Sequence, residues 1–293
     1  MKRIVLFLAT NLAVMITLSL VLGLLGVTGY ITPSGLDYSA LMVFCLVWGM
    51  GGAFISLLIS RFMAKRAMGV QLVDGKSGQA ELDWLHQTVG QLTRKAGLPM
   101  PEVGIYDSPE VNAFATGPSK SRSLVAVSTG LLRSMRREEV EGVLAHEVAH
   151  IANGDMVTLT LIQGVVNAFV MFFSRIIANI VRQMVDEKIS HLVFFVTTIV
   201  FDIAFGILGS MVVAWFSRAR EFRADAGGAQ LAGKANMIGA LQRLMQNKEL
   251  VDNGQPQLAT MKIAGAKGGF MSLISTHPPL EVRIAALQQA QIL

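Results

Sequence analysis

The chain has 293 residues, of which 52% are apolar and only 15% are charged, and its mean hydropathy is +0.52. Soluble domains carry roughly 25% charged residues, so this chain has too few charges to coat a surface that faces only water. The composition predicts membrane segments and excludes a disordered chain, which requires low hydrophobicity and high net charge. The net charge of +5 comes without a basic stripe interleaved with aromatic residues, so no nucleic-acid partner is expected.

Four apolar stretches are long enough to cross a lipid bilayer, whose core requires about 20 helical residues. They comprise residues 4–27, 38–60, 156–174 and 192–217. The fourth stretch contains one charged residue, Asp202, which is a candidate functional residue because charges inside a membrane are costly. Arg175 is its candidate partner, and a purely structural charge facing the helix bundle is an equally good interpretation.

Lys and Arg residues are distributed unequally between the two ends of these stretches. One side carries Lys2, Arg3, Arg61, Lys65, Arg66, Arg218, Arg220 and Arg223. The other side carries only Arg182 and Lys188. Because basic loops remain in the cytoplasm, we expect both chain termini and both long polar segments to be cytoplasmic. The only cysteine, Cys45, lies in an apolar stretch, so no intramolecular disulfide can form.

The polar segments have the pattern of a mixed α and β domain. Helices are expected at 80–96, from near 136 to 153, and at 280–289, and short strands at 103–106, 111–116 and 124–128. Ser134 is a candidate cap for the second of these helices. Residues 247–269, rich in Gly, Gln and Lys, are expected to form a mobile loop.

The predicted organisation alternates membrane and cytoplasmic parts. It comprises an N-terminal transmembrane hairpin (1–60), a cytoplasmic subdomain (61–155), a second transmembrane hairpin (156–217) and a cytoplasmic segment that completes the domain (218–293). The fold class is therefore a membrane protein, mostly α with a small β-sheet.

His146, Glu147 and His150 form an H-E-x-x-H sequence inside the expected helix that ends at 153. Histidines four residues apart lie on one face of a helix, so both rings can bind one Zn²⁺. The glutamate beside the first histidine can act as a base on a water molecule. A pair of core histidines beside a solvated glutamate is the alternative, and the helical context favours the metal.

Zinc held by two histidines needs a third protein ligand, and a catalytic site leaves the fourth position to water. No histidine lies at 151–157, so the third ligand must be distant. Glu221 is the candidate, because His150 precedes the third span and Glu221 follows the fourth, which brings both to the same membrane surface. Asp225, one helical turn later, can accept the ring N–H of a bound histidine. The alternative is an amphipathic helix with ion pairs between its turns.

These residues resemble the HtpX family of bacterial inner-membrane heat-shock zinc metalloproteases, a gluzincin family that includes the CAAX prenyl-protein endopeptidases. The resemblance rests on the H-E-x-x-H sequence, Asn153-Gly154-Asp155, Glu221 with Asp225, and Thr276-His277-Pro278-Pro279-Leu280 with Arg283. It implies four transmembrane helices, a cytoplasmic α+β zincin-like catalytic domain and one zinc ion per chain.

The resemblance also implies roles that spacing alone does not give. His277 is expected to donate to the oxyanion, and Arg283 to order the site. From the residues alone, His277 belongs to a turn and Arg283 is an exposed partner. Asn112, Ala113 and Phe114 match a family segment that forms an edge strand, along which an extended substrate binds by strand addition.

The resulting expectation is a zinc-dependent endopeptidase that cleaves cytoplasmic segments of unfolded or damaged membrane proteins at the bacterial inner membrane. Its stress-linked role in quality control is implied by the resemblance alone. A processing protease with one defined client is one alternative, and a zinc-binding membrane scaffold that does not cleave is another. Glu147 argues against the scaffold, because a structural zinc site has no use for an adjacent base. A transporter is disfavoured because the spans offer little of a polar path.

Overall fold

The computed structural model describes residues 2–27, 29–32, 35–254 and 273–291. Contacts divide the chain into two compact units, the first formed by residues 1–56 and 159–213 and the second by residues 57–158 and 214–293. Each unit is therefore assembled from two separate parts of the sequence. The segment boundaries predicted at 60, 155 and 217 remain a prediction, because contacts do not report independent folding.

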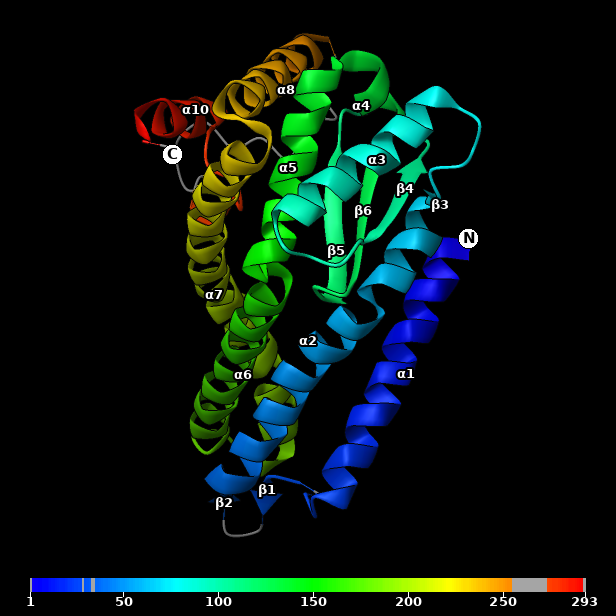
Figure 1. Ribbon diagram of the computed structural model, residues 1–293. Helices are drawn as coiled ribbons and strands as arrows, with labels where there is room; N and C mark the ends of the chain where they lie inside the picture. The colour runs from blue at the N-terminus through cyan, green and yellow to red at the C-terminus, as the bar shows by residue number, and fades with distance from the viewer. Residues whose placement is uncertain (1, 28, 33–34, 255–272, 292–293) are drawn as a thin grey trace. The chain divides into compact units, whose positions relative to one another are not determined.

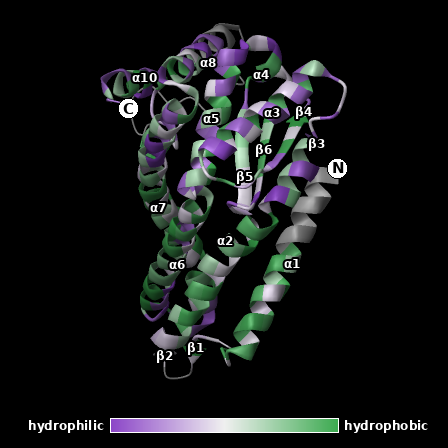
Figure 2. Ribbon diagram, viewed as in Figure 1, coloured by the Kyte–Doolittle hydropathy of each residue, from purple (hydrophilic) through white to green (hydrophobic). Residues whose placement is uncertain are grey.

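Long apolar helices form the first unit. Its elements are α1 (Lys2–Leu24), β1 (Ile31–Thr32), β2 (Gly35–Leu36) and the parts of α2 (Tyr38–Met68), α6 (Asp155–Arg182) and α7 (Glu187–Ala232) within its bounds. Among the described residues, α2, α6 and α7 are long and apolar enough to cross a membrane, and Figure 2 shows the hydrophobic stretches along them. In α1 the same criterion finds only a shorter apolar run, Leu12–Leu24. Three of the four predicted spans thus correspond to helices that could cross a membrane, and the first remains a prediction.

Small residues bring α2 and α6 close together in the first unit. A Cβ atom added to Gly49 would lie 2.6 Å from the backbone nitrogen of Ala168. A Cβ atom added to Gly164 would lie 3.0 Å from the Cα atom of Met50. Glycine and alanine at such positions let apolar helices pack by close backbone approach, which is how membrane helices gain van der Waals contact.

Arg175 and Asp202, the two charged residues singled out in the sequence, form an ion pair between α6 and α7. Arg175 Nη1 lies 3.3 Å from Asp202 Oδ1 and also donates a hydrogen bond to the carbonyl oxygen of Met171 at 3.0 Å. The aspartate inside the apolar helix thus has the partner that the sequence predicts for it.

A four-stranded sheet runs through the second unit (Figure 1). Its strands are β3 (Gln71–Leu72), β4 (Glu102–Tyr106), β5 (Ala113–Ser119) and β6 (Arg122–Ser128), in the spatial order β3-β4-β6-β5. β4 and β6 are parallel, and the other pairs are antiparallel. β5 therefore lies at an edge of the sheet, and it extends further toward the C-terminus than the strand predicted at 111–116.

The helices α3 (Ala80–Lys95) and α5 (Arg137–Asn153) pack against one face of this sheet. Along β6, Val125 and Val127 belong to the core shared with these helices, whereas Leu124 and Ala126 belong to a cluster on the opposite face. Because side chains alternate along a strand, burial of both faces fixes the register of β6. This core fixes α5, the helix that carries the H-E-x-x-H sequence.

The connection from β6 to α5 differs from the expectation. It contains a further helix, α4 (Thr129–Ser134), which Ser128 caps by accepting a hydrogen bond from the backbone N–H of Leu131 at 3.0 Å. Ser134 therefore ends α4, and the prediction that it caps the next helix is wrong. The residue that precedes α5 is Arg136, whose backbone N–H donates to Glu139 at 2.8 Å.

The last part of the second unit contains α8 (Lys234–Gly254) and α10 (Leu280–Gln289). α10 has the predicted bounds. The mobile loop predicted at 247–269 is wrong for residues 247–254, which continue α8, and the remainder lies outside the described residues. Buried apolar residues of α8 and α10 pack against each other and against the end of α7, which brings Arg283 of α10 toward the H-E-x-x-H helix.

Candidate metal centre

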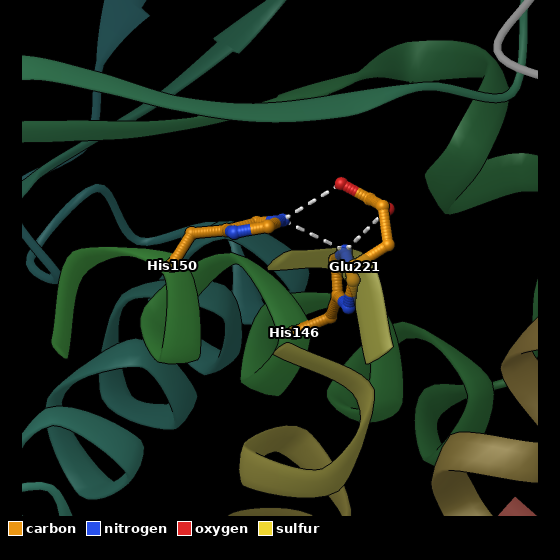
Figure 3. A group of neighbouring side chains, drawn as sticks. All are labelled: His146, His150 and Glu221. Atoms are coloured by element: carbon orange, nitrogen blue, oxygen red, sulfur yellow. Dashed lines mark hydrogen bonds and ion pairs between the residues drawn. The ribbon is translucent and has the colours of Figure 1, made fainter. Parts of the chain in front are cut away.

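His146 and His150 lie one turn apart on α5 and are both buried. Their Nε2 atoms are 3.1 Å apart, and Figure 3 shows the two rings directed toward one point. The helix ends shortly after them, at Asn153, and is followed by Gly154, which has a left-handed φ of 70°. The two nitrogens are therefore close enough to bind one ion together.

Glu221 of α7 completes the group in the second unit, and its side chain is fully buried. Its Oε2 lies 3.5 Å from His146 Nε2 and its Oε1 lies 3.4 Å from His150 Nε2 (Figure 3). Ligands of a tetrahedral zinc ion, at 2.0–2.2 Å from the metal, are about 3.3–3.6 Å from one another. Among the described residues, neither carboxylate oxygen has a hydrogen-bond partner of good geometry. The distances and this unsatisfied carboxylate fit a divalent cation bound by the three residues.

Two glycines let the end of α7 approach α5. A Cβ atom added to Gly228 would lie 3.1 Å from the backbone nitrogen of His146, and one added to Gly227 would lie 2.9 Å from the Cβ atom of Ala149. Any larger residue would push the two helices apart. The absence of side chains at these positions therefore allows Glu221, on the same helix, to reach the histidines.

Asp225 and Arg283 lie behind His146. The Oδ1 atom of Asp225 is 3.0 Å from His146 Nδ1, and Arg283 donates to both oxygens of Asp225, at 2.6 and 2.8 Å. Arg283 Nη1 is also 3.1 Å from Glu221 Oε2. Arg283 is only 3% exposed, so the interpretation of it from the residues alone as an exposed partner is wrong. One guanidinium thus contacts both Glu221 and Asp225 of α7.

His277 and Glu147 lie around the same group. His277 Nδ1 is 2.9 Å from Glu221 Oε2, and its side chain is 26% exposed. The segment that carries His277 is held by Arg218 of α7, which donates to the carbonyl oxygens of Leu273 and Ser275 at 3.2 and 2.8 Å. Glu147 is partly buried on α5, and its charge acts on both His150 and Arg283.

Asn112, Ala113 and Phe114 lie at the start of the edge strand. The carbonyl oxygen of Asn112 accepts from the backbone N–H of Ser128 at 2.9 Å, so this residue faces β6. Hydrogen-bonded and non-hydrogen-bonded pairs alternate along an antiparallel ladder. The backbone groups of Ala113 and Ala115 therefore point away from β6, toward the open edge. Phe114 packs on the far face against Tyr106, with ring centroids 5.7 Å apart.

Residues 79–291 match the model of Peptidase family M48. A protease HtpX homolog of Thiobacillus denitrificans is 56% identical over 295 residues, which cover 99% of this chain and 100% of the relative. The protease HtpX of Aeromonas salmonicida is 54% identical over 298 residues, covering 98% and 100%. The chain belongs to peptidase family M48.

The chain is therefore a membrane-bound metalloprotease, a hydrolase of peptide bonds, and its family implies a metal, generally zinc. The resemblance to HtpX found in the sequence is confirmed. Among solved structures, S. mikatae Ste24p aligns with a TM-score of 0.64 at 18% identity, over 98% of this chain and 66% of that chain. At this low identity the likeness concerns the fold alone.

One contact of the metal centre was missed in the sequence. Asp155 Oδ2 lies 2.7 Å from His150 Nδ1, and Asp155 is 1% exposed. Asp155 was recognised only as the last residue of the motif Asn153-Gly154-Asp155, without a role of its own. A signal was present, because a glycine directly after a helix reverses the chain and can return the next residue toward the last helical turn.

The carboxylates around the histidines govern the protonation of the peptidase's metal-free site. Burial disfavours the charged imidazole, but Asp225 and Glu221 outweigh it and raise the pKa of His146 from 6.5 to about 9. Burial likewise disfavours ionised Glu221, but the three histidines outweigh it and hold the pKa of this carboxyl well below its usual range. At neutral pH the metal-free site therefore holds an ionised Glu221 and a protonated His146.

Zinc binding by the purified protein is expected to release at least one proton near pH 7.5, because His146 must be neutral to bind a metal. Its zinc affinity should therefore rise about tenfold per pH unit up to about pH 9. The folding stability of the metal-free protein changes with pH in the opposite direction to the zinc affinity. Protonated His146 stabilises the folded state fully below pH 6.5, and this contribution is lost as the pH rises through about 9. Calorimetric titration with zinc in buffers of different ionisation enthalpy measures the protons released, and a value near zero would contradict this assignment.

Proposed function

We propose that the chain is a zinc-dependent endopeptidase of the bacterial inner membrane that cleaves cytoplasmic segments of unfolded or damaged membrane proteins. Four spans hold it in the bilayer, with both termini and the active site in the cytoplasm. The observation that carries the proposal is the meeting of His146, His150 and Glu221 at ligand distances beside a glutamate suited to act as base.

His146 and His150 of α5 and Glu221 of α7 would hold one zinc ion. Zinc bound there supplies a Lewis acid that polarises the scissile carbonyl and lowers the pKa of a water molecule to about 7. Arg283 contacts both Glu221 and Asp225 and keeps Asp225 ionised, and Asp225 fixes His146 through its Nδ1 atom.

Glu147 is the proposed general base and acid. It lies next to His146 in the sequence and is partly accessible, so its carboxylate can reach a water molecule in front of the two imidazoles. It takes a proton from the attacking water and passes it to the leaving amine. His277 donates a hydrogen bond to the oxyanion, and its partly exposed ring beside Glu221 supports this role.

The open edge of β5 is the proposed binding site for the substrate backbone. A peptide that lies along Ala113 and Ala115 would pair through main-chain hydrogen bonds, which do not depend on the substrate's side chains. This mode of binding accounts for cleavage of many unfolded sequences. Contacts away from this open edge hold the strand in place. Asn112 accepts a hydrogen bond from β6, and Phe114 packs against Tyr106.

An Ala115→Pro variant is expected to raise KM by at least tenfold and to leave zinc binding unchanged. Proline removes the outward N–H of Ala115 but none that pairs with β6, and proline is tolerated on edge strands. Steady-state kinetics on an unfolded protein, with zinc content measured in parallel, checks this. An unchanged KM would show that the substrate does not pair with this edge.

The breadth of cleavage separates the proposed function from a processing protease with one client. The purified zinc-loaded protein is incubated in detergent with several unfolded proteins and with their folded forms. Cleavage of most unfolded proteins at many sites supports quality control. Cleavage of none of them by a zinc-loaded enzyme would contradict it, and would favour a narrow processing protease or a zinc-binding scaffold.

A further inference from the structure

Asp155 is a buried carboxylate that has no role in the proposed reaction. Only 1% of its surface is exposed, and its Oδ2 atom lies 2.7 Å from His150 Nδ1. Its other oxygen lies 3.4 Å from Nη2 of Arg223, whose side chain is 63% exposed. A buried carboxylate is costly unless it is paired and hydrogen-bonded, so the contact with His150 accounts for its burial.

The backbone at this point is built to return Asp155 to the histidine. α5 ends at Asn153, Gly154 adopts a left-handed φ of 70°, and Asp155 is the first residue of α6. A left-handed conformation is strained for most residues with a side chain. The glycine thus permits a turn of one residue between two helices, and the acid that follows it reaches back to a ring five residues earlier in the chain.

We propose that Asp155 is a positioning residue that holds His150 with its proton on Nδ1, so that the lone pair of Nε2 faces the metal. This inference rests on the proposed zinc site at His146, His150 and Glu221. A neutral imidazole has one proton, and a carboxylate accepts it as a hydrogen bond only from the nitrogen it faces. Asp155 thereby selects the tautomer, fixes the plane of the ring and makes its Nε2 atom more basic.

The carboxylates behind the two histidines are not equivalent. Asp225 behind His146 receives two short hydrogen bonds from buried Arg283, at 2.6 and 2.8 Å. Asp155 behind His150 has a longer contact of 3.4 Å with a largely exposed arginine. Less of the negative charge of Asp155 is therefore offset, and more of it acts on His150.

The test compares Asp155→Asn and Asp155→Ala with wild type in the full-length protein in detergent. Glu138→Gln, which changes an exposed acid of α5, is the matched control. The zinc dissociation constant is measured by competition with a chelator of known affinity, and the unfolding temperature is measured without zinc. Loss of a carboxylate that orients a metal-bound histidine typically weakens metal binding by about 10–100-fold.

We expect a loss of this size for Asp155→Ala and a smaller loss for Asp155→Asn, whose amide oxygen still accepts the hydrogen bond without the charge. The control should bind zinc within about twofold of wild type, since it leaves every contact of the site in place. Asp155 also opens α6, where an acid favours the helix dipole. That structural role would lower the unfolding temperature of the metal-free protein and leave the zinc affinity of the folded protein unchanged.

Zinc affinity within about twofold of wild type in Asp155→Ala would overturn the inference. If wild type binds zinc and cleaves unfolded protein in the same preparation, that result leaves the proposed function intact. A wild type that binds no zinc would instead remove both the proposed function and the inference that depends on it.

Discussion

Replacement of Glu147 by glutamine is expected to reduce peptide cleavage by about 10²- to 10⁴-fold, the usual contribution of a general acid and base. Glutamine has nearly the same shape as glutamate but cannot accept the proton of the attacking water or deliver one to the leaving amine. Because Glu147 is not among the three residues that meet at ligand distance, zinc content should stay at one ion per chain. Metal analysis and the initial rate of cleavage of an unfolded protein provide the two measurements.

Glu138→Gln is the matched control for this experiment, because it makes the same change at an exposed position of the same helix. It should cleave at the wild-type rate. A Glu147→Gln variant that retains zinc and cleaves within a factor of three of the wild-type rate would exclude Glu147 from the chemistry. The smallest loss of rate expected for a general base is about 10²-fold.

An Arg283→Met variant is expected to lose about 3–5 kcal/mol of folding stability at neutral pH, the usual cost of removing one partner of a buried ion pair. Methionine keeps the apolar contacts of the side chain, but Asp225 loses two hydrogen bonds and Glu221 loses a cation 3.1 Å away. Burial favours the neutral acid at Asp225, and Arg283 and His146 outweigh it to lower the pKa of this carboxyl. The difference between variant and wild type should therefore shrink as the pH falls below 3.8, the usual pKa of aspartate.

Thermal or denaturant unfolding of both proteins without zinc measures this loss, with Arg94→Met on the exposed surface of α3 as the control. Added zinc should restore part of the stability of Arg283→Met, because the ion supplies positive charge next to Glu221. Equal stability of Arg283→Met and Arg94→Met would show that the guanidinium does not hold these carboxylates.

The parts of the fold that repeat a simple pattern were predictable from the sequence. The uncharged or nearly uncharged stretches predict α2, α6 and α7 because a bilayer sets a minimum length of apolar helix. Local capping was less predictable, because Ser128 and Ser134 are both suitable caps and only tertiary contacts decide between them. The core cluster on the α5 face of the sheet selects Ser128 by holding the end of β6.

The candidate site, like the fold, was predictable from the sequence only in part. Spacing on one helix predicts that His146 and His150 meet, and membrane topology suggests Glu221 as their distant partner. The burial of Arg283 could not be read from α10 alone, because it results from packing of α10 on α8 and from two carboxylates on α7. The contact of Asp155 with His150 depends on a turn at Gly154, where one backbone angle decides the direction of the chain.

The number of protein ligands on the metal separates a catalytic site from a structural one, because a structural zinc ion has its fourth position closed by the protein. Among the residues that contact Glu221, His277 is the one that could occupy this fourth position, since its Nδ1 atom lies 2.9 Å from Glu221 Oε2. The proposed role of His277 as an oxyanion donor therefore requires that its ring does not bind the metal.

Anomalous diffraction at the zinc edge from crystals of the zinc-loaded protein locates the metal and its ligands directly. We expect one zinc peak about 2.0–2.2 Å from Nε2 of His146, Nε2 of His150 and the carboxylate of Glu221, with solvent in the fourth position. A peak at another place in the chain, or a fourth protein ligand such as His277, would contradict a catalytic zinc at this site.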